Sequence, residues 1–432
     1  MSSCEKCNLM TAMFDAAVVA AKPEKFIPDA LARLLPDQLY GRLFVTGFGK
    51  ASAGMARVVE DHLPPSMQLH FSSEVIVPDG HEEDCKVITI TTASHPVPDA
   101  RGLAAAGRIL DQARSLTTTD LMLVLVSGGG SSLFCLPRKG ITLEQKQKIT
   151  SDLLSTGAPI NQMNCVRKHL SAVKGGHLAV AAYPARTLAL SISDVPGDDP
   201  SIIGSGPTIA NNSSCQDAAE ILAKYNINEP EAAIKLLRED KVLSPSPTAS
   251  VFTNQSYQVI ASPQLALEAA ANLAKRRGVE PIILSNSIEG EAKEVAKAMA
   301  GIAQQVRNYS QPLSPPAVLL SGGETTVTVN GKGEGGRNSE FQLALALKLG
   351  GAEGIFSLAA DTDGIDGNGE NAGAFVTPDT LKNAALNSID ALHYLRQNNS
   401  AAFFQKLNDL FTTGPTHTNV NDFRAILILP QC

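Results

Sequence analysis

The sequence contains no tryptophan, few aromatic residues and no dense cluster of lysine and arginine. With a formal net charge of −7, it lacks the basic surface that a nucleic acid backbone requires. Its clearest apolar run, residues 121–126, is far shorter than the roughly 20 residues that cross a bilayer. We therefore expect a cytoplasmic protein without nucleic acid or membrane partners, in which loops and single cations hold any anionic ligand.

Several catalytic signatures are also missing. The chain has no zinc-binding HExxH spacing, no GxSxG nucleophile elbow and no set of protein-kinase motifs. Its seven cysteines are odd in number and mostly scattered among apolar residues, as in proteins that keep their thiols reduced. The sequence therefore indicates neither covalent catalysis nor a disulfide framework.

The length of the chain and a linker-like segment predict two domains, and the pattern of apolar residues predicts the α/β class. A chain of 432 residues exceeds the usual size of one hydrophobic core. Short apolar runs of strand length alternate with longer stretches of helical periodicity, a pattern typical of sheets with crossover helices. Residues 243–250, rich in serine and proline, read as a linker, so we expect domains over 1–245 and 250–432.

Two predicted strands lead directly into glycine-rich turns suited to phosphate groups. Residues 42–47 lead into GFGKASAG, which places Lys50 at a helix start without matching the dinucleotide or P-loop fingerprint. Residues 121–126 lead into SGGGSS, where successive backbone N–H groups can form an anion nest. The alternative for Lys50 is a surface lysine in a tight turn. The predicted phosphate-binding residues of these two turns are Gly49, Ser127, Gly128, Gly129, Gly130, Ser131 and Ser132.

A third glycine-rich segment follows residue 316. Residues 317–320 predict a buried strand that ends at the turn SGGE, and residues 325–330 predict a second strand. Arg337 stands after a glycine-dense loop and just before a predicted helix, where phosphate and carboxylate groups bind well. The turn adds four residues to the predicted phosphate-binding set: Gly322, Gly323, Glu324 and Thr325.

Four further polar residues are assigned to substrate binding. His95 lies in a loop that two prolines stiffen, and Lys168 belongs to a local cationic cluster in an otherwise acidic chain. A structural histidine and a solvated helix face are the alternatives for these two residues. The full predicted substrate set is His95, Lys168, Lys174 and Ser205.

Carboxylates supply a predicted magnesium shell. Asp194 ends the buried-strand run 187–193, and open α/β sheets bind ligands outside the carboxyl ends of their strands. Asp363 and Asp366 lie in DTDGIDG, which does not have the spacing of a calcium loop. Phosphoryl transfer needs such groups, because Mg²⁺, lysine and arginine neutralise the phosphates while a carboxylate orients the attacking hydroxyl.

Several long segments together resemble the type II glycerate 2-kinases, whose relatives include proteins filed as hydroxypyruvate reductases of the tartrate-utilisation pathway. The resemblance extends over nearly the whole chain, with the motifs in the right order. The segments that carry it are GFGKASAGM at 47, SHPVPD at 94, VSGGGSSLF at 126, RKHLSAVKGG at 167, SDVPGDDPSIIGSGPT at 193, SGGETTVTVNGKGEGGRNSEFQLALAL at 321 and DTDGIDG at 361.

The resemblance implies a fold, a reaction and three catalytic residues. It implies a Rossmann-like parallel-sheet N-terminal domain and a smaller C-terminal α/β domain of the MOFRL type, over about 315–430, with the active site in the cleft between them. It also implies transfer of the ATP γ-phosphoryl group, with Mg²⁺, to the 2-hydroxyl of D-glycerate. The family's functional residues correspond to Lys50, Asp194 and Arg337.

The sequence leaves two alternative functions to consider. An NAD(P)H-dependent hydroxypyruvate reductase shares the substrate skeleton, but GFGKASAG lacks the dinucleotide spacing and Glu74, taken to end a second strand, is a poor ribose partner. A regulatory nucleotide-binding protein would have no need of Lys50, Asp194 and Arg337 together. The oligomeric state is open, with a homodimer as the assembly considered.

Overall fold

The computed structural model describes residues 3–36, 41–64, 67, 72–239 and 250–430. It consists of two compact units. The first unit is Pro23–Ile260, and the second unit combines Met1–Lys22 with Ala261–Cys432. Each unit has its own six-stranded sheet.

The sheet of the first unit has the strand order β3-β2-β1-β4-β5-β6, which is the order of doubly wound nucleotide-binding folds. The strands paired from β3 through β5 are all parallel. The chain order reverses between β1 and β4, and folds of this kind bind ligands at that switch point. The predicted Rossmann-like sheet is therefore confirmed. Its strands are β1 Leu43–Phe48, β2 Glu74–Pro78, β3 Thr89–Ala93, β4 Leu121–Val126, β5 Arg186–Ile192 and β6 Gln255–Ala261.

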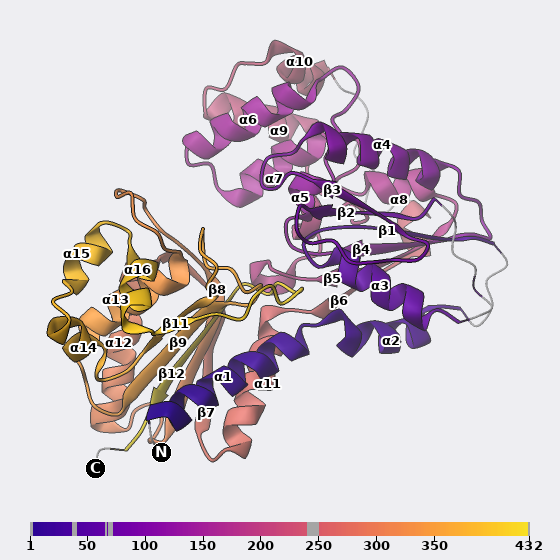
Figure 1. Cartoon of the computed structure of the whole chain (residues 1–432). Coiled ribbons are helices and arrows are strands. Elements are labelled where there is room, and N and C mark those ends of the chain that lie inside the picture. Colours follow the sequence, from indigo (N-terminus) through magenta and orange to yellow (C-terminus); the bar gives the residue numbers. More distant parts are fainter. Residues whose placement is uncertain (1–2, 37–40, 65–66, 68–71, 240–249, 431–432) are drawn as a thin grey trace. The chain divides into compact units, whose positions relative to one another are not determined.

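Helices cover both faces of this sheet (Figure 1). Helices α2 (Pro23–Leu34) and α3 (Ser52–His62) lie on one side, and α4 (Ala100–Arg114) and α8 (His177–Ala182) lie on the other. Alternate strand residues such as Phe44 and Val124 face α4 and α8 and form the main core with them. The sheet is thus buried on both sides, as its near-continuous apolar strands require.

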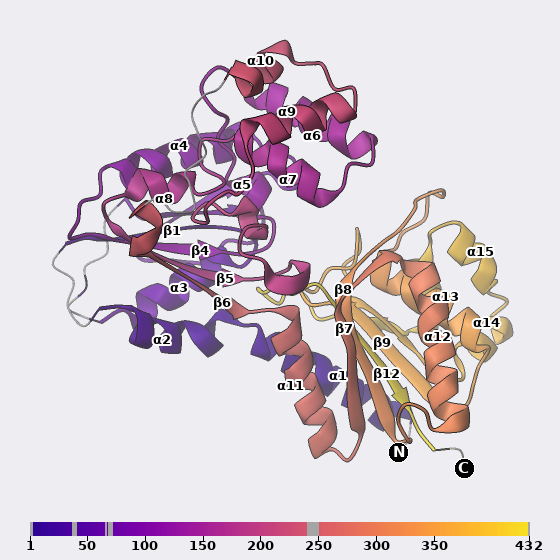
Figure 2. The ribbon, with the colours of Figure 1, turned by 180° about the vertical axis from the view of Figure 1, so that it is seen from behind.

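Four more helices of the first unit form a separate cluster with its own core (Figure 2). They are α6 Leu143–Ser155, α7 Ile160–His169, α9 Cys215–Lys224 and α10 Glu231–Glu239. Helix α6 begins directly after Thr142, because Thr142 and Gln145 form a capping box there. The remaining short elements of this unit are α5 Gly130–Leu133, η1 Pro196–Asp198, η2 Ile203–Ser205 and η3 Ser250–Asn254.

The sheet of the second unit has the order β11-β10-β9-β12-β8-β7 and is mixed. Only β7 and β8 pair in parallel, while β12 pairs antiparallel with both β8 and β9. Helices α12 (Ala292–Tyr309) and α13 (Arg337–Leu349) share a core with one face of the sheet, while α1 and α11 pack on the other (Figure 2). The other elements are α1 Ser3–Ala20, α11 Pro263–Arg276, β7 Glu280–Glu291, β8 Ala317–Thr326, β9 Ile355–Asp361, β10 Gly373–Val376, α14 Thr380–Leu386, α15 Ala391–Arg396, α16 Ser400–Leu407, β11 Leu410–Phe411 and β12 Asp422–Ile428.

The division between the units differs from the predicted one. Helix α1 belongs to the second unit, where Phe14 packs edge-to-face on Phe411 and Phe423 at ring distances of 5.0 and 5.7 Å. The boundary lies at Ile260, because β6 extends the first sheet beside β5. Most of the predicted linker, residues 240–249, lies outside the described residues.

The glycine turn predicted after residue 320 is wrong. Strand β8 continues through Gly322 and Gly323 to Thr326, and it pairs with β7 along this extension. A Cβ at Gly323 would lie 2.2 Å from the backbone N of Ile288, so glycine serves close strand approach here and not a turn. The strand predicted over 325–330 accordingly stops at Thr326. Within the described ranges, no helix has the length and apolar character needed to cross a membrane.

Candidate functional site

The turn after β1 lies directly against the end of β4, at the switch point of the first sheet. Phe48 is in register with Val126, so Gly49 and Ser127 are the next residues on adjacent strands. Gly49 has φ +134°, and a Cβ there would lie 2.2 Å from Ser127 Oγ. The backbone N–H of Lys50 donates to Gly128 O at 2.9 Å. Only glycine fits at position 49. The close contact between the two turns also fixes the backbone position from which the Lys50 side chain extends.

The hydroxyl of Ser127 is used within the protein. Ser127 Oγ accepts from the backbone N of Ala51 at 3.0 Å and lies 3.1 Å from Ser52 Oγ, and Ser52 also donates to Leu125 O. The two serines therefore hold the two turns together. In the same predicted set, the backbone N–H groups of Gly128 and Gly129 donate to no acceptor in the described part of the chain, so they remain candidates for a phosphate contact.

Three predicted ligand-binding residues meet beyond this turn. Lys174 Nζ donates to Ser131 O at 2.7 Å and to Ser131 Oγ at 3.2 Å, and Ser131 Oγ lies 2.8 Å from Ser205 Oγ. Lys174 is almost completely buried, and burial together with the charges of Lys146 and Arg167 holds its pKa well below the ordinary value. Lys168 is also buried, which lowers its pKa, while the charge of Asp199 acts in the opposite direction.

His95 lies over the same turn. A Cβ at Gly129 would lie 2.9 Å from His95 Nε2, so the imidazole ring rests against the glycine backbone. Desolvation by the surrounding atoms, followed by the charges of Lys50 and His81, lowers the pKa of His95 to about 4, although the residue as a whole is exposed. His95 is therefore neutral near pH 7, and the positive charge beside it belongs to Lys50.

Asp194 stands at the same edge of the sheet as Lys50. It follows the carboxyl end of β5, which neighbours β4, and it is half-buried. The carboxylates of Asp199 and Asp194 both act on Tyr257 of β6, whose pKa burial raises to about 12. The turn after β1, the nest after β4 and the carboxylate after β5 thus line one edge of a parallel sheet, as expected of a ligand site. Glu74, in contrast, begins β2 and does not end it, and it pairs with Arg108.

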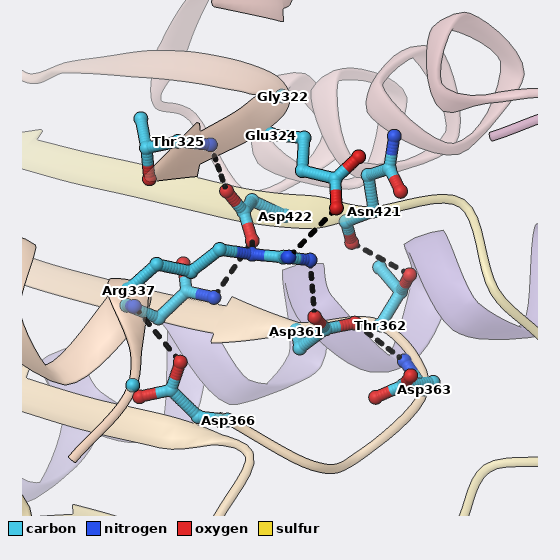
Figure 3. A network of polar contacts seen from close by, with 12 residues as sticks. Gly322, Glu324, Thr325, Arg337, Asp361, Thr362, Asp363, Asp366, Asn421 and Asp422 are labelled. Atoms are coloured by element: carbon cyan, nitrogen blue, oxygen red, sulfur yellow. Dashed lines mark hydrogen bonds and ion pairs between the residues drawn. The ribbon is translucent and has the colours of Figure 1, made fainter. Parts of the chain in front are cut away.

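Arg337 of the second unit lies among three carboxylates (Figure 3). Its Nε donates to Asp422 Oδ1 at 2.7 Å, one terminal nitrogen donates to Asp361 Oδ2 at 2.6 Å, and the other donates to Glu324 Oε1 at 2.9 Å. Burial alone would lower the pKa of Arg337, but the charges of Asp422, Asp361 and Glu324 raise it. The guanidinium is therefore permanently charged and held in one orientation.

A second arginine completes this network. Asp422 pairs through Oδ2 with Arg424, which is fully buried and also donates to Thr325 Oγ1 at 3.0 Å and to Gly322 O at 3.3 Å. Two predicted phosphate-binding residues, Gly322 and Thr325, thus have partners within the protein. Because three carboxylates face two guanidinium groups, one negative charge is uncompensated when all are ionised.

The carboxylates of DTDGIDG have different roles from one another. Burial and the charges of Asp363 and Asp422 raise the pKa of Asp361 well above its ordinary value, against the effect of Arg337. Both oxygens of Asp366 accept backbone N–H groups at the start of α13, from Asn338 at 2.9 Å and Ser339 at 2.8 Å. Asp366 therefore caps a helix. In the described part of the chain, no cluster of three or more His, Cys, Asp or Glu side chains is arranged to hold a metal ion.

Sequence reasoning missed several members of these sites. Asp422 and Arg424 lie in the closing strand β12, and nothing near them in the sequence marks them as polar residues of a site. Lys146 lies on α6, in a segment without a glycine turn or motif that would mark it as part of a site. Asp361, by contrast, opens the DTDGIDG motif, and the rule that strand ends carry ligand groups could have found it.

Two family models match the chain. A domain of unknown function, DUF4147, matches residues 9–238, and the MOFRL family matches residues 317–422. A "Putative hydroxypyruvate reductase" of Agrobacterium vitis is 46% identical, over 98% of this chain and 94% of its own length. A D-glycerate 2-kinase of Thermotoga maritima is 38% identical, over 95% of this chain and 97% of its own length.

A solved structure agrees with these matches. The crystal structure of a glycerate kinase from Thermotoga maritima superposes with a TM-score of 0.89 at 36% identity, covering 98% of this chain and 99% of that one. The similarity extends through both units and is too high for a shared fold alone. This chain belongs to the family that joins a DUF4147 domain to a MOFRL domain, the family of the type II glycerate 2-kinases.

Proposed function

We propose that this protein transfers the γ-phosphoryl group of ATP to the 2-hydroxyl of D-glycerate, giving 2-phosphoglycerate and ADP. The observation that carries the proposal is the turn after β1, where Lys50 and the backbone nest of Gly128 and Gly129 lie at the switch point of a nucleotide-type sheet. The similarity to the D-glycerate 2-kinase of Thermotoga maritima supports D-glycerate as the phosphoryl acceptor.

The residues of the switch point suit charge neutralisation. In the reaction, the 2-hydroxyl oxygen of glycerate forms a bond to the γ-phosphorus while the bond from that phosphorus to the β-γ bridging oxygen breaks. Lys50 and the N–H groups of Gly128 and Gly129 would stabilise the negative charge on the transferring group. Arg337, with its fixed fork geometry, would bind a phosphate or the glycerate carboxylate.

Asp194 is the carboxylate we assign to this chemistry. A carboxylate at the carboxyl end of β5 can accept the proton of the attacking hydroxyl or bind a metal ion. Mg²⁺, when bound with the nucleotide, would supply further neutralisation of the phosphates, and it needs few protein ligands because it keeps waters. Asp194 fits such a shell, with Asp363 as a second candidate, whereas the oxygens of Asp366 are occupied by α13.

The dinucleotide alternative finds little support in the same geometry. The carboxylate that follows β2, where dinucleotide folds bind ribose, is Asp79, and both its oxygens accept from Arg101, at 2.7 and 2.8 Å. The third glycine of the fingerprint is replaced by Ser52, which is buried and hydrogen-bonded.

The proposal is tested by measuring ADP formation from ATP with and without D-glycerate, in the wild type and in Lys50→Gln. Glycerate-dependent ADP release is expected in the wild type, with kcat reduced about a hundredfold or more in the variant. The matched control is Lys86→Gln, an exposed lysine of the same unit, which should keep full activity. Equal activity in Lys50→Gln and the wild type would remove Lys50 from the reaction.

A further inference from the structure

A cavity of about 600 Å³ in the first unit contains three cationic side chains and no carboxylate among its described lining residues. The cations are Lys146, Arg167 and Lys174. The cavity also includes Gly129 and Ser131, so it is continuous with the nest after β4. Its volume is that of sites for nucleotide-sized ligands and is several times what a three-carbon acid needs.

Helix α6 presents two distinct faces, one of which forms a wall of this cavity. Ile149 and Leu153 lie in the core of the helical cluster. The adjacent face follows helical spacing and lines the cavity. Its residues are Leu143, Lys146, Gln147, Thr150, Ser151 and Leu154. Helix α6 therefore contributes a lysine to the wall of the cavity, and neighbouring atoms cover the Nζ of this lysine in the ligand-free protein.

Lys146 is buried there without a charge partner. Its side chain is almost inaccessible, and its Nζ has no hydrogen bond partner among the residues that the structure describes. Burial lowers the pKa of Lys146, Cys135 acts in the opposite direction, and the charge of Arg167 lowers it further. A buried ammonium group with no counter-charge destabilises a folded protein, so a protein that keeps one has a use for it.

Arg167 and Lys174 are two further cations of the cavity, and they also lack an acidic partner among the described residues. Burial lowers the pKa of both side chains. Lys174 donates only to Ser131, and Arg167 forms no ion pair in the described part of the chain. Three converging positive groups without carboxylates are complementary to a ligand that carries several negative charges.

The rim of the cavity has a different character. Val97 and Leu154 both line it, and they are 59% and 60% exposed although both are large apolar residues. Pro96 and Pro98 lie beside Val97. An apolar rim above a cationic floor suits a ligand with a flat apolar ring at one end and phosphates at the other.

We propose that this cavity binds the nucleotide, with Lys146, Arg167 and Lys174 as ligands of the polyphosphate chain and Val97 and Leu154 covering the base. The identity of the ligand as a nucleotide rests on the proposed kinase function, whereas the binding of a polyphosphate does not. Lys146 and Arg167 are then binding residues in addition to those assigned above.

The test measures binding of ADP, inorganic tripolyphosphate and 2-phosphoglycerate to the full-length protein by calorimetry. Lys146→Met is expected to weaken ADP and tripolyphosphate about ten- to a hundredfold. Lys148→Met is the matched control, because Lys148 lies on the same helix, is exposed and pairs with Asp152. Leu154→Ser is expected to weaken ADP and leave tripolyphosphate unchanged.

Unfolding of the ligand-free variants separates binding from folding. Lys146→Met should keep or raise the unfolding midpoint while it loses affinity, because it removes an unpaired buried charge. ADP binding unaffected by Lys146→Met and Arg167→Gln would overturn the inference and leave the kinase proposal standing. Loss of 2-phosphoglycerate binding with intact ADP binding would also overturn it. A wild type that binds ADP through Lys146 but phosphorylates nothing would refute the proposed function instead.

Discussion

Arg337 and Asp422 are joined by a 2.7 Å hydrogen bond from Nε to Oδ1, and this pair links the start of α13 to the start of β12. Asp422 is fully buried and receives further donors, among them the side-chain amide of Asn338 at 2.8 Å. The pair therefore holds together the carboxylate network as well as orienting a guanidinium.

Removal of this guanidinium should affect both folding and catalysis. Arg337→Ala leaves Asp361 and Asp422 buried without their partner, which we expect to destabilise the second unit by about 3 to 5 kcal/mol. Arg337→Lys should lose most activity with a smaller loss of stability, because lysine keeps the charge but not the fork. Urea unfolding and ADP release measure the two effects, with Arg396→Ala, at an exposed position of α15, as the control. A fully active Arg337→Lys would show that the planar fork of the guanidinium group is not needed.

The contact between Gly49 and Ser127 predicts a steric effect at the switch point. Gly49→Ala combines a φ of +134° with a Cβ 2.2 Å from Ser127 Oγ, so we expect a lower melting temperature and loss of turnover. Gly80→Ala is the matched control, because Gly80 also has a positive φ, +84°, but has open space around it. It should cost about 1 kcal/mol, from strain alone. Equal destabilisation by the two variants would show that the close approach is unimportant.

Asp194→Asn should reduce kcat by about a hundredfold or more with little change in stability. A magnesium titration then separates its two proposed roles. If Asp194 orients the hydroxyl, the Mg²⁺ concentration for half-maximal activity stays the same, and if it holds the metal, that concentration rises. The control is Asp199→Asn on the same loop, whose carboxylate accepts a backbone N–H from Ser201 that asparagine can also accept. Unchanged kcat in Asp194→Asn would exclude both roles.

His169 predicts a pH dependence of stability. It is buried beside Asn211 and Ser213, and burial lowers its pKa from 6.5 to about 4. Between these values the unfolded chain binds a proton that the folded chain does not, so this part of the stability is present above pH 6.5 and is lost as the pH falls towards 4. The loss should be about 3 kcal/mol. Urea unfolding at pH 7 and pH 4.5 should show a smaller difference in His169→Asn, and an equal difference would refute the assignment.

The elements that the sequence predicted well carry local signals. Strands β1 and β4 are short runs that end at glycine-rich turns, so their positions do not depend on distant residues. Lys50 and Ser127 could be placed because strand ends of a parallel sheet share one edge. The glycines of β8 were misread, because positive φ serves a tight turn and a close strand contact equally well.

The missing parts of the sites depend on long-range pairing. Two of the three carboxylate partners of Arg337 lie 24 and 85 residues away, in β9 and β12, and no local pattern connects them to Arg337. Lys146 is separated from Lys174 by a complete helix and a loop, and its burial follows only from how α6 packs. Charge and motif are readable from a sequence, whereas the absence of a counter-charge is visible only in the folded chain.

The most direct test of the proposed kinase activity identifies the products formed from ATP and D-glycerate. Purified protein, Mg-ATP and D-glycerate are examined by phosphorus NMR, while a parallel sample with NADH and hydroxypyruvate is followed by absorbance. A 2-phosphoglycerate resonance with a flat NADH trace is the result we predict. A 3-phosphoglycerate resonance would contradict the assigned hydroxyl, and NADH oxidation without any phosphoglycerate would contradict the kinase itself.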